Sequence, residues 1–143
     1  MKTVLFLVQK QLSSCTLLAG ELEKSSSEGI QPVVRGTFTW SSTEMSEYSF
    51  EGIKGLHSEM GTLKTEQLQR SDLEQADVIV LISQAEESLT HLLKASEKKH
   101  VIIRASELSG RSMEDLEYML HNDQTAEVIK DLQQKSVELA AKL

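Results

Sequence analysis

Short apolar runs alternate with stretches of helical spacing along the chain. Apolar runs at residues 4–8, 32–35, 78–82 and 101–103 are rich in branched side chains, which predicts strands buried in a parallel sheet. Apolar residues recur at helical spacing over 13–24, 45–56, 65–73, 86–97, 113–120 and 124–143, which predicts helices there. This alternation predicts an α/β fold.

The composition fits one soluble domain spanning residues 1–143, without repeats or a long linker. The formal net charge is −7 and no basic run occurs, whereas nucleic acid and anionic lipid require a basic surface. No apolar stretch approaches the roughly 18 residues of a membrane span. We therefore expect no nucleic-acid partner and no membrane.

The single cysteine, Cys15, excludes an intramolecular disulfide and a zinc site built on thiolates. No pair of histidines has metal-ligand spacing, so no metal and no cofactor is expected. Residues 1–15 superficially resemble a lipoprotein export signal. Their apolar run is six residues long, shorter than the roughly 7 to 15 residues of such a signal. A cytoplasmic protein is the resulting prediction.

The loop after the first predicted strand is the candidate site, because ligands in such folds bind beyond the carboxyl ends of the strands. Residues 9–16 lead into a helix N-terminus, where free N–H groups favour anions. The hydroxyls of Ser13, Ser14 and Thr16 suit either helix capping or anion contact. No glycine lies between Val8 and Gly20, and no glycine-rich nucleotide motif is present, so nucleotide binding is not predicted.

Four segments resemble one known family: residues 4–8 with 18–22, 36–40, 45–54 and 67–80. They are similar to the low-molecular-weight protein tyrosine phosphatases, which include bacterial arginine phosphatases and one class of arsenate reductases. The resemblance covers nearly the whole chain. It implies a four-stranded parallel sheet in the order 2-1-3-4 with helices on both faces.

The catalytic residues of that family do not carry over. In register with the family's Cys-x5-Arg-Ser loop, the nucleophilic cysteine falls on Gln9 and the phosphate-binding arginine falls on Cys15. An amide cannot act as the nucleophile, and the bidentate arginine clamp is absent. The family's aspartate before a proline is also missing, since neither Asp115 nor Asp123 precedes a proline. For Cys15, a buried inert thiol is favoured over a displaced nucleophile.

These substitutions predict that the chain is not an enzyme but a catalytically inactive relative, with no catalytic residues, that binds a protein partner or a small anion. The residues predicted to form the remnant anion site are Gln9, Ser13, Ser14, Cys15 and Thr16, and Trp40 is a candidate anchor for a partner. The alternative is an enzyme or small-ligand binder with different chemistry at the same loop. Similarity to phosphotransferase-system IIB components is weaker, because their phosphorylated cysteine directly follows the first strand, where this chain has Gln9.

Overall fold

The computed structural model describes residues 2–9, 13–25, 29–36, 65–83, 85–88 and 101–143. The strands are β1 (Lys2–Val8), β2 (Ile30–Gly36), β3 (Thr65–Gln67), β4 (Val78–Leu81) and β5 (Val101–Arg104). The helices are α1 (Ser13–Ser25), α4 (Arg70–Gln75), α5 (Ala85–Ser88), the 3-10 helix η1 (Ala105–Glu107), α7 (Met113–Leu120) and α8 (Thr125–Lys142).

The strands form a parallel sheet in the order β3-β2-β1-β4-β5. β1 is central, and its Phe6 lies opposite Val34 of β2 and Val80 of β4. The four strands predicted from the sequence are present in the predicted order, and β3 adds a short strand at the edge beside β2.

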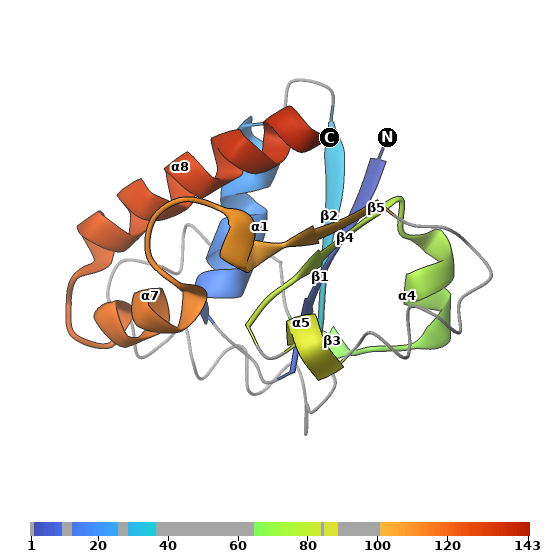
Figure 1. Ribbon diagram of the computed structural model, residues 1–143, viewed down its shortest axis with the longest axis horizontal. Coiled ribbons are helices and arrows are strands. Elements are labelled where there is room, and N and C mark those ends of the chain that lie inside the picture. The colour runs from blue at the N-terminus through green and yellow to red at the C-terminus, as the bar shows by residue number, and fades with distance from the viewer. Residues whose placement is uncertain (1, 10–12, 26–28, 37–64, 84, 89–100) are drawn as a thin grey trace.

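Helices cover both faces of the sheet, as predicted (Figure 1). Val4, Phe6 and Val8 of β1 point into a core shared with α1, α7 and α8. Leu5 and Leu7 point the other way, into a smaller core with α4 and the start of α5. This alternation of neighbouring β1 side chains explains why its apolar run is continuous, since a strand covered on both faces has no solvent side.

One helix prediction is wrong in its start. Residues 65–67 were expected to open a helix, but they pair with residues 34–36 of β2 as β3, and α4 begins only at Arg70. Three polar residues are too few to show the hydrophobic periodicity that distinguishes a strand from a helical turn. Their conformation therefore depends on pairing with the edge of the sheet. The predicted helix over 45–56, most of that over 86–97, and Trp40 lie outside the described residues.

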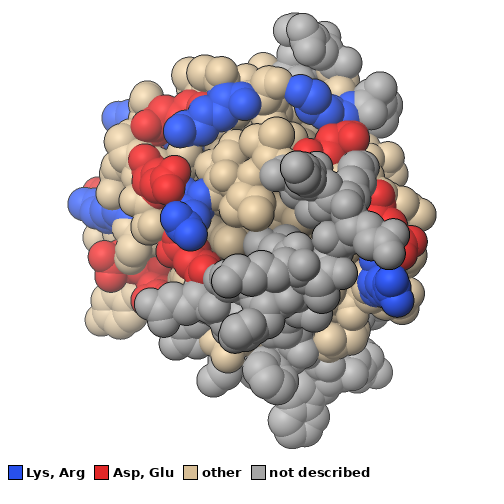
Figure 2. All heavy atoms as spheres, turned by 45° about the vertical axis from the view of Figure 1, so that its right-hand side comes forward, with Lys and Arg blue, Asp and Glu red and all other residues tan. Residues whose placement is uncertain are grey.

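The charged surface is mixed in sign, as the composition indicates. On the face drawn in Figure 2, described Lys and Arg side chains alternate with Asp and Glu side chains. Arg35 Nε lies 3.1 Å from Asp72 Oδ2, and Arg70 Nε lies 3.3 Å from Glu74 Oε1. None of the helices that the structure describes is long and apolar enough to cross a membrane.

Candidate functional site

The site lies where β1 ends and α1 begins. Val8 ends β1 in the core, and Gln9 follows it as a half-buried residue. Ser13 and Ser14 open α1 and are 1% and 0% exposed. The first turn of a helix has N–H groups without partners inside the helix, so these two residues bring buried donors to the carboxyl edge of the sheet.

A carboxylate occupies these donors. The N–H of Ser13 donates to Glu117 Oε1 at 3.1 Å, and the N–H of Ser14 donates to Glu117 Oε2 at 2.8 Å. Each carboxylate oxygen therefore accepts one hydrogen bond from the N-terminus of α1. The helix dipole and the charge-assisted hydrogen bonds both favour an anion at this position. The N-terminus of α1 thus holds a carboxylate side chain from α7.

The two serine hydroxyls differ in their surroundings. The Ser14 hydroxyl donates to the carbonyl oxygen of Met113 at 3.0 Å, which fastens α1 to the first residue of α7. The Ser13 hydroxyl is buried and has no hydrogen-bond partner among the residues that the structure describes. A buried hydroxyl without a partner is destabilising and uncommon, so the Ser13 hydroxyl has hydrogen-bonding capacity to offer a ligand.

Cys15 is not a reactive thiol in this structure. Its side chain is fully buried, and burial strongly raises the pKa of the thiol, with a smaller contribution from the negative charge of Glu117. Thiolates are the nucleophilic form of cysteine, and both effects disfavour the thiolate. The expectation of a buried thiol is confirmed.

Of the five predicted loop residues, Gln9 follows the end of β1, Ser13, Ser14 and Thr16 lie in the first turn of α1, and Cys15 packs into the hydrophobic core. Gln9 and Thr16 each have an interaction partner, and Thr16 is buried in the first turn of α1. Within the described part of the chain, no three His, Cys, Asp or Glu side chains gather as a metal site would require.

Glu117 is the residue that the sequence did not reveal. It lies on α7, where 17% of its side chain is exposed, and His121 Nε2 is 3.4 Å from its Oε1 one turn later. In the sequence, Asp115 and Asp123 are the nearby candidates for the family's aspartate before a proline, and neither precedes a proline. Nothing in the spacing of α7 separates Glu117 from an ordinary surface glutamate, because its partners lie more than a hundred residues away in the sequence.

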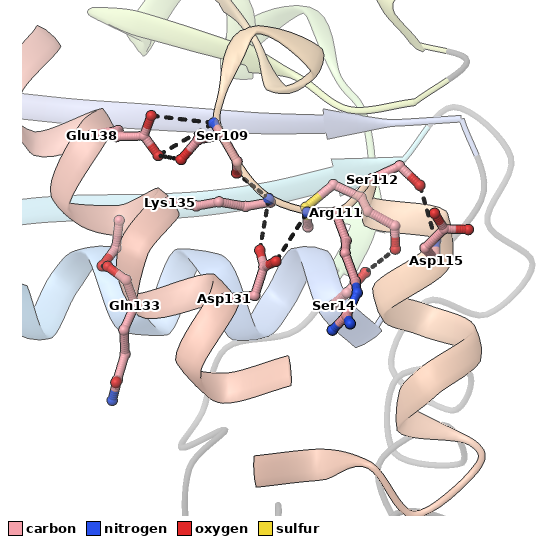
Figure 3. Close-up of polar contacts among 11 residues, drawn as sticks. Ser14, Ser109, Arg111, Ser112, Asp115, Asp131, Gln133, Lys135 and Glu138 are labelled. Atoms are coloured by element: carbon pink, nitrogen blue, oxygen red, sulfur yellow. Dashed lines mark hydrogen bonds and ion pairs between the residues drawn. The ribbon is translucent and has the colours of Figure 1, made fainter. Parts of the chain in front are cut away.

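A polar network holds the start of α7 in place (Figure 3). The Ser112 hydroxyl accepts a hydrogen bond from the N–H of Asp115 at 3.1 Å and so caps the helix. Before this cap, Lys135 Nζ donates to the carbonyl oxygen of Ser109 at 2.7 Å, and Asp131 Oδ2 accepts from the N–H of Arg111 at 2.9 Å. The chain that leads to α7, and with it Glu117, is therefore fastened to α8.

A cleft of about 330 Å³ lies beside the site, between the ends of β4 and β5 and the start of α7. Its polar lining includes Ser83, Glu86, Ser106 and Glu114. The Ser106 hydroxyl donates to Glu86 Oε1 at 2.6 Å. The backbone of Ser83 has a φ of 55°, which residues other than glycine rarely adopt. Backbone strain of this kind is common near functional sites.

The comparisons with known proteins agree with the fold expected from the sequence. No protein-family model matches the chain, and no curated protein sequence matches it. Among solved structures, the chain is similar to a low-molecular-weight protein tyrosine phosphatase from T. tengcongensis, with a TM-score of 0.71, 17% identity and 100% coverage of both chains. It is also similar to the YwlE arginine phosphatase from Geobacillus stearothermophilus, with a TM-score of 0.65, 13% identity, and coverage of 99% of this chain and 95% of that one.

A thioredoxin-dependent arsenate reductase from Corynebacterium glutamicum is a third such structure, with a TM-score of 0.60 and 9% identity over 99% of this chain and 61% of that one. These similarities confirm the predicted resemblance and the predicted sheet order at the level of the fold.

One prediction is corrected by the same comparisons. The chain was expected not to be an enzyme, but the chains that share its fold from end to end are phosphatases, and an arsenate reductase shares it too. The shared fold therefore gives the expectation of a non-enzyme no support. The substitutions at Gln9 and Cys15 remove the residues of one reaction route, whereas the N–H groups of Ser13 and Ser14 still donate to a carboxylate.

Proposed function

We propose, from a fold shared with phosphatases and an arsenate reductase, that this chain is an enzyme whose ligand carries a phosphate-type oxyanion bound at the N-terminus of α1. The observation that carries the proposal is the carboxylate of Glu117, held by the N–H groups of Ser13 and Ser14 at 3.1 Å and 2.8 Å. Because these two N–H groups hold the Glu117 carboxylate, they could hold the oxyanion of a ligand in its place.

A tetrahedral oxyanion fits the donors better than a carboxylate does. Glu117 uses both of its oxygens on the two N–H groups, and the Ser13 hydroxyl has no partner in the described part of the chain. A phosphate-type group has further oxygens to offer this hydroxyl. The position also matches the place where parallel α/β sheets bind ligands, beyond the carboxyl end of a central strand.

The proposed chemistry does not pass through a covalent cysteine intermediate. The Cys15 thiol is buried with its pKa raised by burial, and Gln9 holds an amide at the end of β1. Glu117 is the carboxylate that contacts these donors, and once a ligand has displaced it from them it can act as the general base for a water molecule. These residues suit direct transfer of the phosphoryl group from the ligand to water.

Titration of the ¹⁵N-labelled protein with inorganic phosphate tests the ligand class. We expect saturable changes in the amide resonances of Ser13 and Ser14, and no such changes with sodium chloride at the same ionic strength. If the amide resonances of Ser13 and Ser14 do not change on addition of phosphate, the proposed site is contradicted.

Hydrolysis of p-nitrophenyl phosphate tests the reaction class. We expect a rate that Cys15→Ala leaves unchanged, because the thiol does not contact the donors of the site. Loss of turnover in this variant, with the fold intact, would show a cysteine-dependent reaction instead. Absence of turnover in the unmodified chain, across phosphate esters and phosphoarginine, would contradict the proposed activity.

A further inference from the structure

We infer that Glu117 is a built-in competitor for the oxyanion site, an autoinhibitory carboxylate that the ligand must displace from the N-terminus of α1. The inference rests on the proposed function and adds how access to that site is controlled.

The geometry makes the two occupants mutually exclusive. Glu117 Oε1 accepts from Ser13 at 3.1 Å, and Glu117 Oε2 accepts from Ser14 at 2.8 Å. A backbone N–H that already donates to one acceptor at this distance has little to give a second. Two negative groups on the same pair of donors would also repel each other. An incoming oxyanion therefore gains these hydrogen bonds only when the carboxylate leaves.

The side chain can leave without moving its helix. The backbone of α7 is capped by Ser112 at one end and tied to α1 by the hydrogen bond from Ser14 to Met113. Glu117 itself is not sealed in, since 17% of its side chain is exposed. Release then requires only rotation of the glutamate side chain towards solvent.

His121 lies beside the carboxylate of Glu117 on its exposed side. It lies one helical turn further along α7, with 53% of its side chain exposed, and its Nε2 is 3.4 Å from Glu117 Oε1. The backbone N–H of His121 also donates to the carbonyl oxygen of Glu117, so the two residues lie one helical turn apart on the same face of α7. Glu117 therefore stands between a buried pair of amide donors and an exposed imidazole.

Competition of this kind weakens the apparent affinity of the ligand. Hydrogen bonds to a charged acceptor are stronger than those to a neutral one, by an amount equivalent to about tenfold in an equilibrium constant. Glu117→Gln keeps the size and one acceptor oxygen but removes the charge. The variant should therefore bind inorganic phosphate about tenfold more tightly than the unmodified chain.

The experiment measures the dissociation constant of inorganic phosphate by following the amide resonances of Ser13 and Ser14 in three proteins. These are the unmodified chain, Glu117→Gln, and the control Glu114→Gln, which removes the same charge from an exposed position on α7. Thermal unfolding of each protein confirms that it is folded. Glu117→Ala serves as a second variant, because it removes the competing acceptor altogether.

Tighter binding in both Glu117 variants, with the control unchanged, is the expected result. Equal affinity in all of the proteins would overturn the inference and leave the proposed oxyanion site standing. An equal gain in Glu114→Gln would overturn it as well, because the effect would then be one of general charge. Failure of every protein to bind phosphate at Ser13 and Ser14 would overturn the proposed function, and the inference with it.

Discussion

Lys135 Nζ lies 2.7 Å from Asp131 Oδ1, one turn away on α8, and 1% of the Lys135 side chain is exposed. The contact is an ion pair and not an aligned hydrogen bond, since Asp131 Oδ1 forms no hydrogen bond with any described residue. Lys135 also donates to the carbonyl oxygen of Ser109, and Asp131 accepts from the N–H of Arg111. The Lys135–Asp131 pair thus contacts the segment that leads to α7 at two points, Ser109 and Arg111.

Lys135→Met should destabilise the protein strongly. The methionine fills a similar volume, but Asp131, with 11% of its side chain exposed, loses its cationic partner. Removing one member of a buried pair costs about 3 kcal/mol of unfolding free energy, because the other charge stays behind. Urea unfolding measures the change.

The matched control is Lys130→Met, at an exposed position of the same helix, which should change stability by less than about 0.5 kcal/mol. The double variant Lys135→Met with Asp131→Leu should recover part of the loss, since no buried charge then remains. A double variant less stable than Lys135→Met would contradict this explanation.

Gly110→Ala should loosen the same segment. Gly110 has a φ of +92°, and a Cβ there would lie 2.6 Å from Asp131 Oδ2 and 2.8 Å from Oδ1. The backbone conformation alone costs an alanine about 1 kcal/mol, and the clash adds to it. Chemical denaturation should show a loss of about 2 kcal/mol or more. The double variant Gly110→Ala with Asp131→Ala separates the two causes. It lacks the clash, so its loss should be smaller than the sum of the two single losses.

Glu138 should contribute stability that acid removes. Hydrogen bonds from the hydroxyl of Ser109 at 2.6 Å and from its N–H at 3.2 Å lower the pKa of the Glu138 carboxyl, with the hydroxyl as the larger cause. A lowered pKa in the folded state means that the folded protein binds fewer protons. The contribution is therefore present above the usual glutamate pKa of about 4.3 and is lost as the pH falls through the lowered value.

Thermal unfolding between pH 7 and pH 3 measures this dependence. The unmodified protein should lose more stability over this range than Glu138→Gln or Ser109→Ala, because each variant removes one side of the hydrogen bond. Identical pH profiles for all three proteins would contradict the assignment.

The sequence predicted the fold well because its signals are local. The apolar runs of β1 and β4 report burial on both faces, and the spacing of α7 and α8 reports one buried stripe on each helix. The short edge strand β3 escaped prediction because its three residues owe their conformation to pairing with β2. Local preference carries little weight in such a segment.

The sequence places Ser13 and Ser14 at the start of a helix after a buried strand, but it does not reveal what contacts them. A buried strand that ends at Val8 comes shortly before the helix that Ser13 and Ser14 open, and the apolar pattern of the sequence shows this order. The occupant, Glu117, comes from a helix about a hundred residues later, and the fastening of that helix by Lys135 comes from later still. Contacts across such separations leave no periodic signal in one sequence, so the identity of the anion at the site required the structure.

Cys15 should be inert towards thiol reagents and should make the protein sensitive to alkali. Burial raises the pKa of its thiol in the folded state, whereas the thiol of the unfolded chain ionises at its ordinary pKa of about 8.5. The folded state therefore binds more protons than the unfolded state above that pH. Stability should then fall as the pH rises through about 8.5, by up to about 1.4 kcal/mol per pH unit from this group.

Urea unfolding between pH 7 and pH 10, with the same series for Cys15→Ala, separates this contribution from those of other groups. The variant should be less stable at pH 7, because it leaves a small cavity, and should lose less stability as the pH rises. In the native protein, a thiol reagent should modify Cys15 only at the rate at which the structure opens. Rapid modification at pH 7 without unfolding would show that Cys15 has an accessible thiolate and is a candidate nucleophile, which would contradict this prediction.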